Sequence, residues 1–331
     1  MKISIVTLNY NGSKETLELL KTLKDQTHSA SSGQADKDFE IIIIDNASEE
    51  ADFTNLQTGI DQLIHSFPLT TSQVVYPQVK VIKNTDNLGF SGGNNVGIRV
   101  ALGWNNDSDP VKSPQRGDNG ASWVVLLNND TWVENDFIER LRTVLKVKKS
   151  IVAVPLIEGD RTAYYGQIQW LKPTLIHITT SQVVYPQVYA IGGAMAIRKD
   201  VFEKIGLLDE NYFLYFEDAD FSVRARKAGF DISIANPPAS RLSVHHHTSS
   251  STKKLGSPLL LRYHYRNALY FNLKNGPWYI KLLVWQWSLI IVSKQLGKLV
   301  IGKNMEESKA ILSGVIDFYK GKMGKIENLE S

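Results

Sequence analysis

The chain has 331 residues, 43% of them hydrophobic and 21% charged, which is enough for one large or two smaller domains and excludes a wholly disordered protein. It contains no cysteine, so a disulfide framework, thiolate metal sites and a cysteine nucleophile are excluded. The net charge is +3, but residues 251–331 carry 13 Lys or Arg against 5 Asp or Glu, whereas the first 250 residues carry 24 against 29. A basic tail on an acidic body predicts a polyanionic partner, either nucleic acid or an anionic membrane surface.

An α/β architecture is predicted for the first 130 residues. Apolar runs predict strands at residues 3–8, 39–44, 79–82 and 123–127, and helical spacing predicts helices at 14–26 and 96–102. The run at 39–44 is almost wholly apolar, as in a parallel strand that is covered on both faces. This alternation indicates a mostly parallel sheet with right-handed crossovers, on which ligands bind at the carboxyl ends of the strands.

The next block, up to about residue 250, mixes strands and helices. Strands are predicted at 151–155, 189–197 and 231–235, and a helix at 218–228. Segments 29–38 and 105–122, rich in Ser, Gly, Asp, Asn or Pro, predict loops. The decapeptide TTSQVVYPQV occurs at 70–79 and again at 179–188, which indicates a local duplication rather than a solenoid repeat.

Polar residues end the first two predicted strands, and a glycine-rich segment follows the third. Thr7 and Asn9 end the first strand and Asp45 the second, where a carboxylate can accept a hydrogen bond from a ribose hydroxyl or a base N–H. An Asp-Asn pair also caps helices, so both interpretations stay open. Glycines such as Gly92 at a helix start let the backbone approach an anionic ligand, and a simple tight turn is the alternative. Their spacing is not G-x-G-x-x-G, so NAD binding is not predicted.

A cation site is predicted where the strand at 123–127 ends. There Asn128 and Asn129 lead to Asp130, which can hold a hard divalent cation that bridges phosphate oxygens of a substrate. A capping aspartate is the alternative. An imidazole from the triplet at 245–247, assigned to His245, can complete the site. The three histidines alone do not predict a zinc site, because no second ligand group has the required spacing.

Three carboxylates, Glu217, Asp218 and Asp220, lie within four positions at the start of a predicted helix, after an aromatic segment. They repel one another, so they need a compensating cation or a chemical role. Neighbouring negative charge and aromatic burial raise the pKa of a carboxyl group, which suits a general base. The alternative is that acidic residues stabilise the first turn of a helix through its dipole.

In this order, the clusters resemble an inverting family 2 glycosyltransferase with the GT-A fold, most closely its bacterial rhamnosyltransferase-like branch. The resemblance covers residues 1 to about 250. Its motifs are VTLNYN (6–11), DNAS (45–48), NLGFSGGNN (87–95), LNND (127–130), GGA (192–194) and FEDAD (216–220). It implies a Rossmann-like, mostly parallel sheet flanked by helices, with a nucleotide-sugar half at about 1–130, an acceptor half at about 131–250 and a helical C-terminal extension at 251–331.

The resemblance also implies roles for individual residues. Asp218, or else Glu217, is the expected catalytic base. Asp130 takes the metal role, with His245, for Mg²⁺ or Mn²⁺, although the family's DXD motif reads Asn128-Asn129-Asp130 here. The residues expected to bind the nucleotide-sugar are Thr7, Asn9, Asp45, Asn87, Gly92, Asn128 and Asn129. Those expected to bind the acceptor are Gly192, Gly193 and Asp220.

The basic tail is expected to reach a membrane surface. Residues 278–302 mix Trp and Lys with Leu and Ile, and the uncharged segment 282–293 is shorter than the ~20 residues that span a bilayer. Such a helix fits the lipid headgroup region, and packing on the body is the alternative. The chain begins without a basic segment followed by a long apolar stretch, so we expect a cytoplasmic protein peripheral to the inner face of the cell membrane.

The expected reaction moves a sugar, rhamnose from a dTDP donor by preference or else a UDP-hexose, to a saccharide hydroxyl on a lipid-linked acceptor in cell-surface polysaccharide synthesis. Nucleic acid is not expected as a partner. Two other classes stay open: a nucleotide-sugar binding module without turnover, and a nucleotidyltransferase. The acidic cluster argues against the first because pure binding does not need it. The second needs a basic glycine-rich loop near the N-terminus, and NYNG (9–12) has no nearby Arg.

Overall fold

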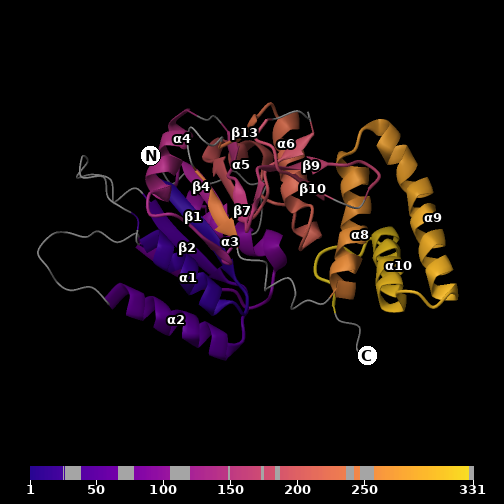
Figure 1. Ribbon diagram of the computed structural model, residues 1–331, viewed down its shortest axis with the longest axis horizontal. Coiled ribbons are helices and arrows are strands. Elements are labelled where there is room, and N and C mark those ends of the chain that lie inside the picture. Colours follow the sequence, from indigo (N-terminus) through magenta and orange to yellow (C-terminus); the bar gives the residue numbers. More distant parts are fainter. Residues whose placement is uncertain are drawn as a thin grey trace, which may run out of the picture.

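The computed structural model describes residues 1–24, 26, 39–65, 78–104, 120–147, 150–172, 175–182, 187–235, 242–246 and 257–327. Their centre is a seven-stranded mixed sheet with the order β13-β6-β12-β4-β1-β2-β3 (Figure 1). The strands are β1 (Ile3–Asn9), β2 (Phe39–Asp45), β3 (Gln78–Lys83), β4 (Trp123–Leu127), β6 (Ile151–Ala153), β12 (Ala194–Arg198) and β13 (Ile232–Ile234). The α/β sheet predicted from the sequence is confirmed.

The four strands of the first half run parallel, as the apolar runs predict. β1 pairs with β2 on one side and β4 on the other, and β2 pairs with β3. β12 then runs antiparallel to both β4 and β6, so the sheet is mixed. In this register Asn9 lies beside Asp45, which brings the polar ends of the first strands to one edge of the sheet.

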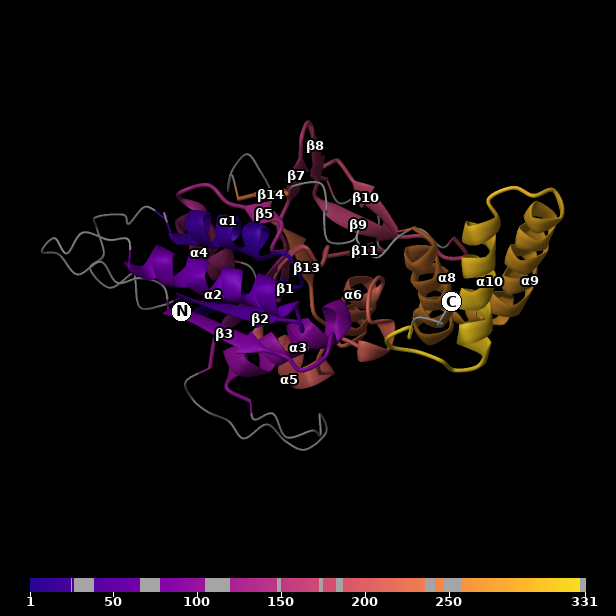
Figure 2. The same cartoon turned by 90° about the horizontal axis from the view of Figure 1, so that it is seen from below.

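Helices cover both faces of the sheet (Figure 2). On one face lie α1 (Ser13–Lys24), α2 (Glu50–His65) and α4 (Phe137–Val147), whose leucine and isoleucine side chains enter one core. On the other lie α3 (Gly89–Leu102) and α5 (Lys199–Ile205), which enter a second core. α6 (Glu217–Lys227) contributes Val223 to the first core and Phe221 to the second. α6 therefore sits where the two cores approach each other.

Two elements differ from the sequence prediction for packing reasons. α3 begins at Gly89, seven residues before the predicted helix at 96–102, because its glycines let it approach the sheet. A Cβ atom on Gly93 would lie 2.4 Å from Leu8, and one on Gly97 would lie 2.4 Å from Val6. The single strand predicted at 189–197 is divided between β11 (Val188–Tyr189) and β12, which belong to different sheets.

Two small sheets lie beside the main one. The first joins β5 (Thr131–Trp132), β14 (Val244–His246), β7 (Leu156–Glu158) and β8 (Arg161–Ala163), and the second joins β10 (Leu175–Ile178), β9 (Tyr165–Ile168) and β11. A short 3₁₀ helix, η2 (Glu210–Tyr212), precedes α6. The loop predicted at 29–38, most of that at 105–122, and parts of both decapeptide copies lie outside the described residues.

Three helices, α8 (Ser257–Asn275), α9 (Trp278–Val300) and α10 (Met305–Tyr319), form a lobe at one end of the molecule (Figure 1). Leu269 of α8, Val284 and Ile291 of α9, and Ile311 and Val315 of α10 pack together as its core. Within the described part of the chain, no helix combines the length and the hydropathy needed to cross a bilayer. α8 also enters the core of the main body with Ala268 and Phe271, so the lobe and the body share this helix.

Candidate active site

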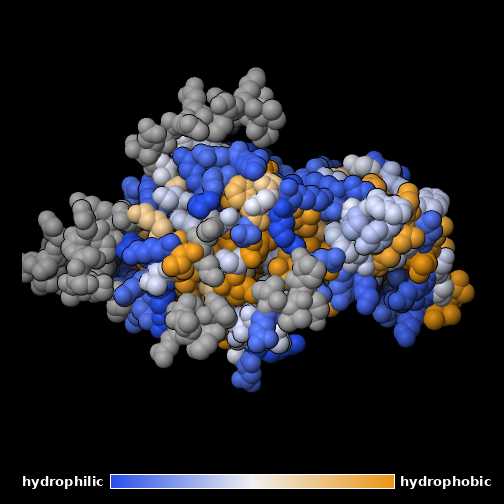
Figure 3. Space-filling model, turned by 90° about the horizontal axis from the view of Figure 1, so that it is seen from above, coloured by the Kyte–Doolittle hydropathy of each residue, from blue (hydrophilic) through white to orange (hydrophobic). Residues whose placement is uncertain are grey.

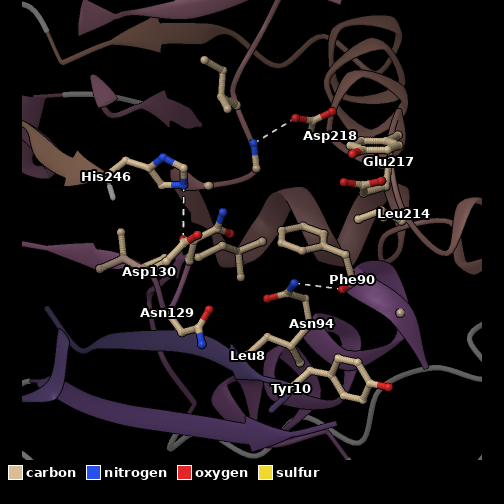
Figure 4. A pocket seen from close by; sticks show the side chains of 18 of the residues that line it. Leu8, Tyr10, Phe90, Asn94, Asn129, Asp130, Leu214, Glu217, Asp218 and His246 are labelled. Atoms are coloured by element: carbon tan, nitrogen blue, oxygen red, sulfur yellow. Dashed lines mark hydrogen bonds and ion pairs between the residues drawn. The ribbon is translucent and has the colours of Figure 1, made fainter. Parts of the chain in front are cut away.

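A cavity of about 350 Å³ opens at the carboxyl ends of β1 and β4, under the two small sheets (Figure 4). The sheet edge contributes Leu8, Tyr10 and the segment 126–130, and α6 contributes Glu217 and Asp218. Figure 4 shows Asp130 with His246 on one side of the space and Glu217 with Asp218 on the other. The predicted site residues that line this cavity are Asn87, Asn128, Asn129, Asp130, Gly192, Gly193, Glu217 and Asp218.

Asp218 is held in the cavity wall by two backbone amides. The Gly192 N–H donates to its Oδ2 at 2.9 Å and the Ala219 N–H to its Oδ1 at 2.7 Å. Burial raises the pKa of Asp218 to about 6, while these backbone hydrogen bonds oppose the increase. At neutral pH this carboxyl is therefore ionised but more basic than an ordinary aspartate.

Glu217 is in a different state. It is 6% exposed, and its Oε2 accepts no hydrogen bond from any described residue. Burial and the neighbouring charge of Asp218 raise the pKa of Glu217 well above its ordinary value. Both causes favour the protonated form of Glu217, and in that form it can donate a hydrogen bond into the cavity.

Asp220 does not reach the cavity, which contradicts its predicted contact with an acceptor. It is fully buried on the other side of α6, since residues two positions apart on a helix point in different directions. Its carboxylate accepts from Arg224 at 2.7 Å, Asn275 at 2.7 Å and the Tyr212 hydroxyl at 3.2 Å, and pairs with Lys274 at 2.8 Å. Asp220 therefore joins α6 to α8.

The segment before α6 is strained and is held by α8. Phe213, Tyr215 and Phe216 have backbone φ angles of 59°, 71° and 75°, which residues other than glycine rarely adopt. The Asn267 amide donates to the carbonyls of Tyr212 at 2.8 Å, Leu214 at 2.7 Å and Tyr215 at 3.2 Å. This one side chain fixes the turn that presents Glu217 and Asp218.

Four of the predicted nucleotide-sugar residues lie behind the cavity rather than in its wall. Asn9 and Asp45 are fully buried, and the Asn9 amide donates to Asp45 at 2.8 Å and to Ser48 at 3.1 Å. Thr7 is 2% exposed and Gly92 is buried in the first turn of α3. Asn9 and Asp45 link β1 to the end of β2 through their hydrogen bonds, whereas the buried Thr7 hydroxyl has no hydrogen-bond partner among the described residues.

Asn46, next to Asp45, lies in the wall instead. Its side chain donates to Asn87 Oδ1 at 2.9 Å and accepts from the Leu88 N–H at 3.1 Å, so it fixes the loop before α3. Tyr10 lines the same side. Asn46 and Tyr10 belong to motifs that the sequence singles out, but the nucleotide-sugar contacts were predicted for their neighbours Asp45 and Asn9. A strand alternates its side chains between two faces, and the last residue of a strand does not reveal which neighbour faces the ligand.

The structure places His246, and not His245, beside Asp130. His246 Nε2 lies 3.2 Å from Asp130 Oδ1, and its Nδ1 lies 2.7 Å from Glu158 Oε1. His245 points to the other face of β14 and stacks on Trp132 with 3.7 Å between ring centroids. The prediction is therefore shifted by one residue, because consecutive strand residues face opposite sides. His247 lies outside the described residues.

The pair Asp130 and His246 fits a divalent cation that a substrate also ligates. Burial lowers the pKa of His246, but the hydrogen bonds and charges of Asp130 and Glu158 outweigh it and the net pKa is raised. The described residues hold no group of three or more His, Asp or Glu side chains arranged for a metal ion. One carboxylate and one imidazole leave most of an octahedral shell for phosphate oxygens and water, as Mg²⁺ and Mn²⁺ require.

Two cavity residues come from strands that no sequence motif marked. Glu158 ends β7, and His177 lies on β10, where burial lowers its pKa. These strands have three and four residues, too few for a periodic pattern to emerge. They close the cavity over the side of Asp130 and His246.

A model of the family described as Glycosyl transferase family 2 matches residues 4–206, more than half of the chain and most of the cavity-forming segments. The chain belongs to glycosyl transferase family 2. Among relatives of this family 2 member, the dTDP-rhamnosyl transferase RfbF of Shigella flexneri is 27% identical over 57% of this chain, and the alignment spans 61% of that protein. The N-acetylglucosaminyl-diphospho-decaprenol L-rhamnosyltransferase of Mycobacterium tuberculosis is 30% identical over 63% of this chain and 72% of that protein.

Solved structures give the same fold for this family 2 chain. Staphylococcus aureus TarS 1–349 in complex with UDP-GlcNAc matches 97% of this chain and 81% of its own, with a TM-score of 0.55 and 14% identity. The mannosyltransferase PcManGT from Pyrobaculum calidifontis, in complex with GDP-Man and Mn²⁺, matches 97% and 88% with a TM-score of 0.54 and 10% identity. The GT-A architecture is thereby confirmed.

Proposed function

We propose that this family 2 member is an inverting glycosyltransferase that moves a sugar from a nucleotide-sugar to a saccharide hydroxyl, with Asp218 as the general base. The observation that carries the proposal is the arrangement of one cavity: a buried carboxylate with a pKa of about 6 faces Asp130 and His246 across it. One end can accept a proton, and the other can hold an anionic leaving group.

The side chains on α6 act on the acceptor. An alcohol has a pKa far above 7, so Asp218 must take its proton as the new bond forms. The Gly192 and Ala219 amides hold the Asp218 carboxylate in one orientation, which positions its lone pairs for that transfer. In its protonated form, Glu217 can donate a hydrogen bond to a second hydroxyl of the acceptor. Attack from the side opposite the leaving group inverts the anomeric centre without a covalent glycosyl-enzyme.

Asp130 and His246 would hold a divalent cation, Mg²⁺ or Mn²⁺. When bound, such a cation supplies positive charge against the negative charge that develops on the departing nucleoside diphosphate. Glu158 accepts a hydrogen bond from His246 Nδ1, which fixes the imidazole so that Nε2 faces Asp130. The structural neighbour PcManGT is described with GDP-Man and Mn²⁺, which supports a cation of this class.

The names of two relatives support a choice of donor. The Shigella relative is named a dTDP-rhamnosyl transferase and the Mycobacterium relative transfers L-rhamnose to a diphospho-decaprenol-linked sugar. We therefore propose dTDP-rhamnose as the donor, with a UDP-hexose next, and a lipid-linked saccharide at the cytoplasmic face of the membrane as the acceptor. The two rival classes, a binding module and a nucleotidyltransferase, have no observation here that favours them.

The test is a screen of the purified protein against dTDP- and UDP-sugars with Mg²⁺, Mn²⁺ or EDTA. Calorimetry measures binding, and release of the nucleoside diphosphate measures hydrolysis or transfer. Selective, cation-dependent release from one donor supports the proposal and identifies that donor. If the protein bound several donors but released no diphosphate with any saccharide acceptor, a binding module would replace the transferase. If it bound none of them, the proposal would be wrong.

A further inference from the structure

The outer helix of the C-terminal lobe, α9, has two different sides. Its inner side is buried against α8 and α10 through Ile280, Val284, Ser288, Ile291 and Gln295. Its outer side leaves large apolar side chains in solvent: Trp278 is 75% exposed, Leu282 65% and Ile290 65%. The other exposed large hydrophobic residues on α9 and the turn after it are Tyr279, Leu283, Trp285, Leu289, Leu296, Val300 and Ile301. Figures 1 and 2 place α9 at the end of the molecule farthest from α2.

These side chains lie on one side of α9, interrupted by the exposed polar residues Gln286 and Ser293. In Figure 3, hydrophobic residues lie at the outer edge of the helical lobe among paler and hydrophilic ones. An α-helix has 3.6 residues per turn. Viewed down the axis of α9, the exposed apolar positions cover an arc that has Trp285 at one end and Ile301 at the other. This arc lies opposite the buried side and is broader than the seam of a coiled coil. Monomeric proteins rarely leave so large an apolar patch uncovered, so a partner surface is indicated.

The charge around this apolar face is of one sign. Lys281 borders one edge, Lys294 and Lys298 border the other, and Lys303 follows the helix. No Asp or Glu occurs between residues 278 and 304. Among the described residues, no ion pair involves any of these four lysines. An apolar face with lysines along both edges and tryptophans on it matches the interface between lipid headgroups and acyl chains.

A second copy of the chain fits this face poorly. Two copies of α9 would bring their lysines together with no acidic side chain to pair with, whatever the direction of pairing. The bulky Trp278 and Trp285 also suit a coiled-coil seam less well than the aliphatic residues usual there. A bilayer with anionic lipids offers the opposite charge and an apolar interior at once.

We infer that α9 binds an anionic bilayer, lying in its headgroup region with the face of Trp278, Leu282 and Ile290 turned toward the acyl chains. The inference concerns a surface outside the cavity and does not depend on the proposed transferase reaction. It places the chain at a membrane as a peripheral protein, with the lysines of α9 near lipid phosphates.

The experiment is co-sedimentation of the full chain with vesicles of phosphatidylglycerol and phosphatidylcholine, and with vesicles of phosphatidylcholine alone. A triple variant, Trp278→Gln, Leu282→Gln and Ile290→Gln, removes the apolar face, and a second, Lys281→Gln, Lys294→Gln and Lys298→Gln, removes the charge. The matched controls are Val147→Gln and Lys146→Gln, at the exposed end of α4 on the body. Size-exclusion chromatography reports the oligomeric state of every variant.

The wild type and both controls should bind the anionic vesicles, and salt should weaken that binding. At about fivefold for each lysine near the surface, the charge variant should bind on the order of 100-fold more weakly. The apolar variant should bind at least tenfold more weakly. Equal sedimentation of the wild type and the apolar variant would overturn the inference. So would a wild-type dimer that the apolar variant dissociates without any vesicle binding, because a second copy would then be the partner. Donor binding, measured on the same preparations, tests the transferase proposal separately.

Discussion

At the scale of single residues, the neighbours Glu217 and Asp218 differ in the groups that act on their carboxyl oxygens. Both are buried carboxyl groups at the start of α6 whose pKa values are raised by burial. The charge of Asp218 raises the pKa of Glu217 further, whereas the Gly192 and Ala219 amides oppose the increase at Asp218. The two carboxyl groups in the same wall thus have different surroundings. Their substitutions by amides should therefore have unequal effects.

Asp218→Asn should lower kcat by a factor of about 10²–10⁴, the usual contribution of a general base, because an amide cannot accept the acceptor's proton. Glu217→Gln should lower it much less, since an amide resembles the protonated acid and still donates a hydrogen bond. Steady-state kinetics gives kcat, and calorimetry should show unchanged donor affinity for both. The reverse order of effects would assign the base to Glu217.

The pH dependence of the reaction should report Asp218. Its pKa is raised to about 6, and the active form is the ionised one, so kcat/KM should fall tenfold per pH unit below about 6 and level off above it. The kcat/KM profile is measured from about pH 4.5 to about pH 8 with saturating cation. If kcat/KM fell only below the ordinary pKa of aspartate, burial would not raise the pKa of Asp218 as stated.

His246 and His245 offer a matched pair for the cation site. His246→Ala should raise the Mn²⁺ concentration for half-maximal donor binding at least tenfold, since it removes the imidazole that lies 3.2 Å from Asp130. His245→Phe replaces the imidazole that stacks on Trp132 by another aromatic ring, so it should leave that Mn²⁺ concentration unchanged. Calorimetric titrations of donor at several Mn²⁺ concentrations provide the measurement. Equal effects of the two variants would mean that β14 does not present one histidine to the cation.

The sequence could show that an acidic cluster and a histidine triplet belong to a site, but not which members face it. Asp220 belongs to the acidic cluster, yet it is turned toward α8. There Lys274 forms an ion pair with it and Asn275 donates a hydrogen bond to it, from 54 and 55 residues away in the chain. The pairing of β14 with β5 and β7 turns the side chains of His245 and His246 to opposite faces of that strand. Both outcomes depend on tertiary contacts that a local pattern does not contain.

At the scale of elements, the prediction succeeded where one physical signal dominates. The continuous apolar runs of β1, β2 and β4 arise because both faces of a central parallel strand are buried, and the structure has those strands within one residue of the predicted bounds. α3 was predicted too short because its first turns are glycine and asparagine, which have low helix propensity. Their packing against β1 outweighs that propensity.

α8 supplies an element-scale prediction, because its Asn267 holds the strained turn before α6. Asn267→Ala should remove three hydrogen bonds to the turn and lower kcat at least tenfold, while donor affinity stays unchanged. The control is Asn272→Ala on the same helix, a buried amide whose Nδ2 has no hydrogen-bond partner among the described residues.

The two asparagine variants should lower the melting temperature, and only Asn267→Ala should lower kcat. A loss of kcat in proportion to the loss of stability in both variants would reduce Asn267 to an ordinary core residue. Thermal unfolding and kinetics on the same preparations separate these outcomes. The test is sharp because both substitutions remove the same group from one helix.

At the scale of the whole molecule, α8 makes the boundary at residue 250 less simple than the change in composition indicates. The change from an acidic to a basic segment is real, but α8 is buried on both sides: Phe271 lies in the core of the body and Leu269 in the core of the lobe. Arg266 is 1% exposed and donates to the Tyr212 carbonyl. Charge composition reports what solvent and partners meet, and it does not report which helix completes a core.

Two truncations should therefore behave differently. A chain that ends at residue 276 keeps α8, so it should still bind donor, with a lower melting temperature because Leu269 becomes exposed and Arg262 loses Asp317.

A chain that ends at residue 256 also loses Lys274 and Asn275 as partners of buried Asp220. Asp220 keeps Arg224, but it loses these two partners, and the loss of Phe271 from the core costs a further ~3–5 kcal/mol. The total is comparable to the whole stability of a domain, so this shorter chain should fail to fold. Circular dichroism and donor calorimetry measure both properties, and a folded, donor-binding 1–256 chain would show that α8 is dispensable to the body.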